Sequence, residues 1–175
     1  MKRLGLVFLA LGTAFFSVAE AGGREPLPAQ PPRPLTAYGQ LSAAQGAKFD
    51  RIFLATLPAY LEVGQRIANS AFYGSKNPEV KAFAAQTKTT YSVSLAKLRS
   101  WGGTQSSIMD IVRPQGDYDR WFLKYYPRQN EEIRQLLLLV PTHTQNRHLR
   151  QFAAGLLPKL SAEDARARLL LKTLK

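Results

Sequence analysis

The chain contains no cysteine, and its 175 residues include two methionines and two histidines. The mature protein therefore has no disulfide, no thiol nucleophile and no lipid-anchored cysteine. Acidic residues are also scarce, since 12 Asp and Glu stand against 24 Lys and Arg and give a formal net charge of +12. The sequence has no glycine-rich phosphate loop and no serine-nucleophile motif. The scarcity of acidic residues makes the protein basic. The missing catalytic motifs favour a protein that is not an enzyme.

The first 21 residues have the layout of a secretory signal peptide. Lys2 and Arg3 precede an almost wholly apolar run over 4–19, and residues 19–21 form an Ala-x-Ala cleavage site. This run is short for a bilayer span of about 20 residues. We expect cleavage before Gly22, and hence a secreted or periplasmic protein.

Residues 22–40 follow the predicted cleavage site and hold five prolines. Such a composition favours extended, solvated backbone, so we predict a disordered leader. The remaining residues, 41–175, suffice for one domain with its own core.

Two segments that lie 69 residues apart resemble each other. Residues 49–58 are FDRIFLATLP and residues 118–127 are YDRWFLKYYP, and the match continues without a gap from Asn77 to Asn146. A repeat of this length is one supersecondary unit that cannot bury its apolar face alone. The sequence therefore predicts an all-α protein built from two helical hairpins, repeat 1 at about 42–101 and repeat 2 at about 117–174.

In repeat 1, the S-x-x-Q pattern over 42–45 predicts the capping box of a first helix that ends near Phe72. Its predicted core-facing stripe comprises Phe49, Phe53, Tyr60, Gly64, Ile67 and Ala71. Asn77 and Pro78 then predict the start of a second helix that reaches Trp101. That helix has an apolar stripe with alternating steps of four and three residues, as in an antiparallel bundle.

In repeat 2, we predict a helix from about Asp117 to Val140 that Pro141 ends, and another that starts near Asn146. Pro158 and the sequence over 161–164 predict an interruption, followed by a short C-terminal helix over 162–174. Pro58 and Pro127 fall inside the first helix of each repeat, at equivalent positions.

These motifs resemble the domain of unknown function 305 family. The resemblance rests on Asp50, Phe53 and Leu54 at an opening motif, on 77–80 at a D-P-E-V turn, and on Trp101 as a closing aromatic. Asp119, Phe122, Leu123, Asn146, Leu149 and Ala153 repeat it more weakly. The resemblance implies a ferritin-like four-helix bundle and, in some members, copper bound by histidine and methionine. The domain of unknown function 4142 family is the second resemblance, through PEVKAFA at 78–84.

The metal-binding residues of the first family are replaced in this chain. Tyr60 and Leu61 stand where repeat 1 would carry its histidine pair, and Gln129 and Asn130 stand there in repeat 2. Imidazole and thioether groups are the ligands that hold copper. We therefore expect no cofactor and no metal site, with copper binding as the alternative.

Other candidate site residues are few. His143 and His148 are weak metal candidates, because a spacing of five does not place two ligands on one helical face. Asp50 and Asp119 could form an acid–base pair, but we favour caps or ion pairs at a helix crossing. A possible binding surface comprises Arg120, Trp121, Lys124, Tyr125 and Arg128, because consecutive aromatic residues on a helix cannot all face one core. The alternative is that these aromatics pack against the leader or the long connection over 102–116.

These features together predict a secreted or periplasmic binding or structural module of the cell envelope. Its basic surface would attract anionic envelope polymers or lipid headgroups. No recognition motif supports a specific nucleic-acid partner. Copper handling in the periplasm is the alternative function.

Overall fold

A computed structural model describes residues 34–104 and 117–174. Within these ranges the chain forms five helices and no strand, which confirms the predicted all-α class. The predicted signal peptide, most of the predicted leader and most of the 102–116 connection lie outside the described residues. The helices are α1 Pro34–Ser42, α2 Gly46–Gly74, α3 Pro78–Ser100, α4 Tyr118–His143 and α5 Arg147–Thr173.

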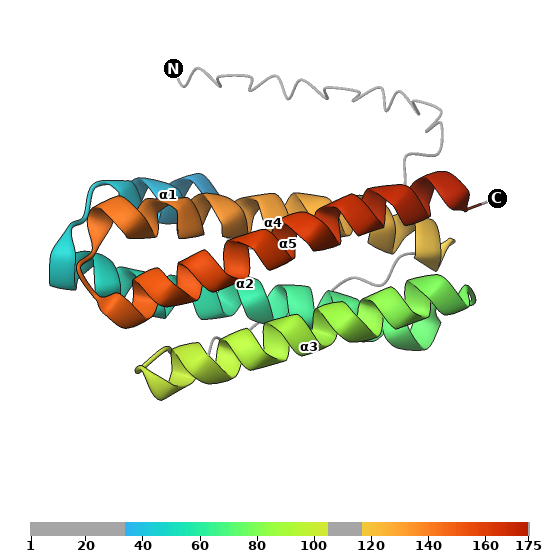
Figure 1. Ribbon diagram of the computed structural model, residues 1–175, viewed down its shortest axis with the longest axis horizontal. Coiled ribbons are helices and arrows are strands. Elements are labelled where there is room, and N and C mark those ends of the chain that lie inside the picture. Colours follow the sequence, from blue (N-terminus) through green and yellow to red (C-terminus); the bar gives the residue numbers. More distant parts are fainter. Residues whose placement is uncertain (1–33, 105–116, 175) are drawn as a thin grey trace, which may run out of the picture.

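Four long helices lie alongside one another, and the short α1 packs against α4 and α2 (Figure 1). The α2–α3 and α4–α5 pairs are antiparallel hairpins, and α4 runs opposite to α2 (Figure 1). The end of α3 and the start of α4 therefore lie at opposite ends of the molecule. Just after α3, the Thr104 amide donates to the Leu54 carbonyl of α2 at 3.3 Å. None of the described helices combines the length and apolar character that a membrane span requires.

The core lies between the four long helices and includes the residues that the apolar stripes predict. All six predicted stripe residues of α2 are buried. The predicted α3 positions from Val80 to Leu98 are buried as well, with Trp101 half-buried at the helix end. Because each stripe faces a neighbouring helix, the bundle buries apolar surface along its whole length.

The two hairpin turns use the same capping residue. The Asn77 side-chain oxygen accepts hydrogen bonds from the amides of Glu79 and Val80 at 2.9 and 3.3 Å. Asn146 caps α5 in the same way, through the amides two and three residues later at 3.0 and 3.4 Å. Both predicted helix starts are thereby confirmed.

Asp119 in the first turn of α4 also caps the α2–α3 turn. Its Oδ2 accepts a hydrogen bond from the Asn77 amide at 3.1 Å, so it serves as a cap between helices. At the other turn, the Asn146 amide instead donates to Thr144 Oγ1 at 2.9 Å. Asp50, at the equivalent position of α2, has one buried carboxylate oxygen, Oδ1, without a hydrogen-bond partner. The structure does not join Asp50 and Asp119 as an acid–base pair.

Removing either asparagine cap is expected to destabilise the protein by about 1 kcal/mol, because two helix amides lose their acceptor. Asn77→Ala and Asn146→Ala would be measured by urea unfolding. Gln145→Ala is the matched control, since Gln145 is exposed beside the cap. A loss for Asn146→Ala no larger than that of the control would contradict the assignment.

The prediction for residues 34–45 is wrong in two respects. Residues 34–40, expected as part of a disordered leader, belong to helix α1, and Ser42 ends that helix. No capping box forms either, since Gln45 precedes α2 without a side-chain cap and Ser42 Oγ donates back to the Gly39 carbonyl at 3.1 Å. Buried Leu41 anchors α1. Gly46, at φ +55°, allows the sharp turn into α2.

The predicted break at Pro158 and the separate C-terminal helix are also wrong. Helix α5 is continuous from Arg147 to Thr173, and Ser161 Oγ donates to the Leu157 carbonyl at 3.1 Å within it. Pro158 lies on the exposed side, so the carbonyl that loses its hydrogen bond, on Ala154, faces solvent. The buried stripe through Leu160 and Ala167 continues past the proline. Pro141 likewise lies within α4, on its exposed side, and the helix ends two residues later.

Candidate functional site

The aromatic residues of the predicted surface on α4 are buried, so that prediction is wrong for them. Trp121 and Tyr125 are 5% and 9% exposed, and their rings stack with centroids 5.5 Å apart. Lys124 and Arg128 are exposed, and Arg120 pairs with Asp117 at 3.3 Å. The physical reason is that α4 packs against α1, α2 and α5, so more than one of its faces is covered.

The two histidines lie near one hairpin turn but face different partners. The His143 ring lies 5.4 Å from the Phe49 ring, and its Nε2 is 3.1 Å from the Ser42 carbonyl oxygen. The His148 ring lies 5.7 Å from the Trp101 ring. Among the described residues, no group of three or more His, Cys, Asp and Glu side chains is placed to hold a metal ion.

The four positions that would carry the histidine pairs of the resembled family lie in the core. Tyr60, Leu61, Gln129 and Asn130 are each at most 4% exposed. Gln129 Nε2 donates to the Tyr60 carbonyl at 3.1 Å and so ties α4 to α2. Asn130 is the centre of a larger polar network.

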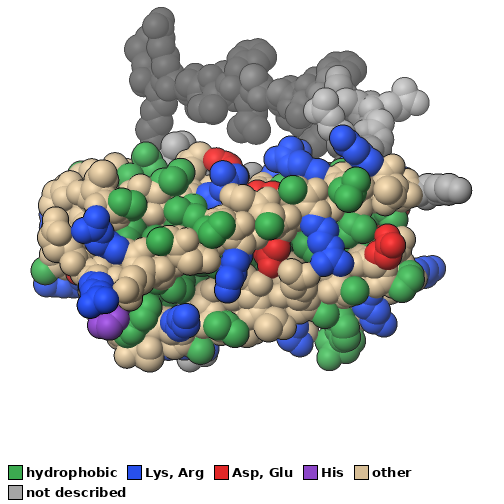
Figure 2. Space-filling model, in the orientation of Figure 1, with side chains coloured by type: hydrophobic (Ala, Val, Ile, Leu, Met, Phe, Trp, Pro, Cys, Tyr) green, Lys and Arg blue, Asp and Glu red, His purple; other side chains and the backbone are tan. Residues whose placement is uncertain are grey.

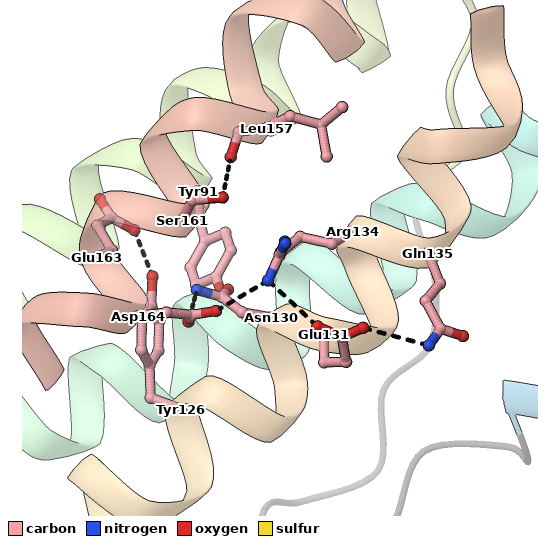
Figure 3. A network of polar contacts seen from close by, with 10 residues as sticks. All are labelled: Tyr91, Tyr126, Asn130, Glu131, Arg134, Gln135, Leu157, Ser161, Glu163 and Asp164. Atoms are coloured by element: carbon pink, nitrogen blue, oxygen red, sulfur yellow. Dashed lines mark hydrogen bonds and ion pairs between the residues drawn. The ribbon is translucent and has the colours of Figure 1, made fainter. Parts of the chain in front are cut away.

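The Asn130 network links α3, α4 and α5 inside the bundle (Figure 3). Tyr91 of α3 donates its hydroxyl hydrogen to Asn130 Oδ1 at 2.5 Å. Asn130 Nδ2 donates in turn to Asp164 Oδ1 of α5 at 2.8 Å. The second oxygen of Asp164 lies 3.6 Å from Arg134 Nη1. Both polar atoms of the Asn130 side chain therefore have a hydrogen-bond partner: Oδ1 accepts from Tyr91, and Nδ2 donates to Asp164.

A second branch joins the same three helices at Glu163, which is 4% exposed. The Tyr126 hydroxyl donates to Glu163 Oε2, and the Thr90 hydroxyl donates to Oε1 at 2.7 Å. The Tyr126 ring packs against Tyr91 at 6.1 Å and edge-on against Phe83 at 5.3 Å. A buried carboxylate is tolerated here because both of its oxygens accept hydrogen bonds.

Burial sets the protonation behaviour of these groups. It raises the pKa of Tyr91 and of Tyr126 well above the ordinary value, so both hydroxyls stay neutral donors. Burial also raises the pKa of Asp164, against the lowering effects of Asn130 and Arg134. Burial, together with the charge of Glu132, raises the pKa of Tyr125 to about 12. The neutral hydroxyl of Tyr126 thus holds the Glu163 carboxylate directly, and that of Tyr91 holds Asp164 through Asn130.

A groove lies on the outer side of this network, between α3 and α5. These two helices touch over fewer residues than the other neighbouring long helices. The groove consists of two adjoining hollows of about 440 and 410 Å³ that share Gln86, Thr90 and Lys159. Its walls include hydroxyl, amide and ammonium groups, and Phe152 and Leu156 contribute apolar surface.

Three cations border the groove: Lys97, Lys159 and Arg166. Within the described ranges, none of them forms an ion pair. Arg166 Nη1 instead reaches across to Gln86 Oε1 at 2.6 Å. In Figure 2, which looks onto α5 and α3, Lys and Arg side chains spread over this face with few acidic ones between them.

Sequence reasoning missed both the network and the groove. Glu163 and Asp164 carry the signal, but the predicted break at Pro158 assigns them to the first turn of a new helix. On a continuous α5, their spacing from Leu160 and Ala167 places them on its buried face.

Comparison with known proteins finds no matching family model, no matching curated protein and no matching solved structure.

Proposed function

We propose that this protein is a non-enzymatic module of the cell envelope, secreted or periplasmic, that binds anionic polymers through its basic surface. The observation that carries the proposal is the unequal exposure of the two kinds of charge. Among the described residues, fifteen of eighteen Lys and Arg side chains are exposed, whereas three of nine acidic ones are. The exposed acids are Glu79, Asp117 and Glu131.

The buried and half-buried acids make the surface more basic than the composition suggests. Glu163 and Asp164 are held inside the bundle by the networks of α3 and α4. Helix α5 therefore presents exposed positive charge alone, from Arg147 to Lys172. A surface of one charge sign attracts polyanions and accelerates their association.

The proposed fold is a ferritin-like four-helix bundle made of two hairpins with a common origin, preceded by the short α1. The course of the helices supports it, because two antiparallel hairpins are joined by one connection between opposite ends of the molecule (Figure 1). The identical caps at Asn77 and Asn146 support the relation between the hairpins. The signal-peptide pattern over 1–21 supports a location outside the cytoplasm.

Binding to an acidic polymer is expected to weaken by about tenfold or more between low salt and about 0.5 M salt, because salt screens exposed charges. Co-sedimentation of the purified mature protein with an acidic polysaccharide, with a neutral polysaccharide as control, measures this. Anionic vesicles provide the comparison with a lipid surface. Equal binding to the neutral polysaccharide, or binding unaffected by salt, would overturn the proposal.

A further inference from the structure

We propose that the groove between α3 and α5 binds a single strand of an acidic polysaccharide, with its carboxylate groups next to Lys97, Lys159 and Arg166. This inference rests on the proposed function and assigns it a site and a ligand class. Four properties of the groove support it: its length, the chemistry of its walls, its unpaired charges and a glycine in its lining.

The groove is elongated along the helices. Its lining on α3 extends from Gln86 to Lys97, which corresponds to about 16 Å at the rise of an α-helix. Its lining residues come from α3 and α5, two helices that run side by side (Figure 1). An extended chain can lie in such a hollow, whereas a flat membrane surface would touch its rims and leave its floor empty.

The walls combine the two kinds of contact that a sugar chain makes. Hydroxyl and amide groups come from Thr89, Thr90 and Gln151, and they can exchange hydrogen bonds with sugar hydroxyls. Val93, which is 52% exposed, offers apolar surface to the C–H faces of sugar rings.

The charges select an acidic chain. Lys97 and Lys159 border one hollow, and Lys159 and Arg166 border the other, so positive charge accompanies the groove throughout. Glu163 is the one carboxylate among the described lining residues. Both of its oxygens accept hydrogen bonds, from Thr90 and Tyr126, and its side chain is turned into the bundle. The repulsion between Glu163 and a bound anion is therefore weaker than the attraction from the three exposed cations.

Gly155 is an exposed residue that lines the groove on α5. It lies inside α5, where glycine costs about 1 kcal/mol relative to alanine. A Cβ atom built at Gly155 would meet nothing within 4 Å, so no neighbour requires the missing side chain. The position is thus an empty space within the groove, and a large side chain there would fill it without a clash in the core.

The test measures binding of an oligogalacturonate by calorimetry at low salt, with the methyl-esterified oligomer as the uncharged ligand of the same shape. Gly155→Trp is expected to weaken binding by about tenfold or more, because the indole ring would occupy space in the groove. Lys97→Glu combined with Lys159→Glu is expected to weaken it by about tenfold or more through charge. Lys172→Glu is the matched control, because Lys172 is exposed on the same helix outside the groove. It should change affinity by about twofold or less.

Circular dichroism and urea unfolding establish that each variant is folded, and the double lysine variant tests the site even if Gly155→Trp does not fold. If wild type binds but the groove variants bind as well as Lys172→Glu, the groove is not the site and the proposed function still stands. Equal binding of the esterified oligomer would overturn the role of the cations. If the wild type binds no acidic polymer at low salt, the proposed function itself fails.

Discussion

Replacing Gly64 by alanine is expected to destabilise the protein by about 2–4 kcal/mol, even though alanine is the better helix former. Gly64 is buried in α2, opposite the ring of Tyr91. A Cβ atom there would lie 2.5 Å from Tyr91 Cε2 and 2.7 Å from Cζ, which is closer than carbon atoms can approach. The added methyl group therefore forces a movement of one of the two helices or of the ring.

The ring cannot move without further loss. Tyr91 is fully buried, and its hydroxyl is held by Asn130 at 2.5 Å. Displacing it would leave the Asn130 oxygen unsatisfied in the core, which costs about 1–3 kcal/mol. The clash and the lost hydrogen bond together outweigh the gain of about 1 kcal/mol in helix propensity.

Gly155→Ala provides the matched control, since it is the same substitution within a helix at a site where the methyl group meets nothing within 4 Å. We expect it to be neutral or to stabilise the protein by up to about 1 kcal/mol. Urea unfolding of both variants gives the comparison. Tyr91→Leu in the Gly64→Ala background should cost less than Tyr91→Leu alone, because the clash has been removed. Equal effects of the two alanine substitutions would show that Gly64 is not a contact point for Tyr91.

Local signals predicted those parts of the fold that depend on local contacts. The starts of α3 and α5 follow from Asn77 and Asn146, whose side chains bond amides two and three residues away. Apolar periodicity likewise identified the buried faces of the helices. Where tertiary packing competes with a local signal, the prediction failed. Pro158 and Ser161 have the sequence of a helix boundary, but the buried stripe of α5 continues through both.

The candidate site depends on contacts between helices that are distant in the sequence. Asn130 contacts residues 39 and 34 positions away, and the charged walls of the groove face each other across α3 and α5. Which residues meet across helices depends on how the helices pack against one another. The apolar periodicity of a single helix does not reveal that arrangement. The burial of Trp121 and Tyr125 has the same origin, because the pattern of α4 cannot show that three other helices cover it.

Asn130→Leu is expected to destabilise the protein by about 3–5 kcal/mol, although leucine fits a position of this volume. Leu61, which corresponds to Asn130 in the first repeat, is itself fully buried. The loss arises from the partners that remain. The Tyr91 hydroxyl loses its acceptor, and Asp164 loses the donor that binds its Oδ1. The Tyr91 hydroxyl and the Asp164 Oδ1 atom would then lack hydrogen bonds in the core, while Asp164 Oδ2 keeps Arg134 Nη1 at 3.6 Å.

Removing the whole network should cost less than removing its centre. In a triple variant that combines Asn130→Leu with Tyr91→Phe and Asp164→Leu, no polar group of the three is left unsatisfied, and apolar packing replaces the hydrogen bonds. Arg134 keeps its ion pair with Glu131 at 3.2 Å and remains partly exposed. We therefore expect the triple variant to recover most of the stability that Asn130→Leu loses, as measured by the midpoint and slope of urea unfolding. A triple variant as unstable as Asn130→Leu would show that the hydrogen bonds themselves stabilise the bundle. Recovery with an unchanged slope would show that apolar packing can replace the network without loss of cooperative unfolding.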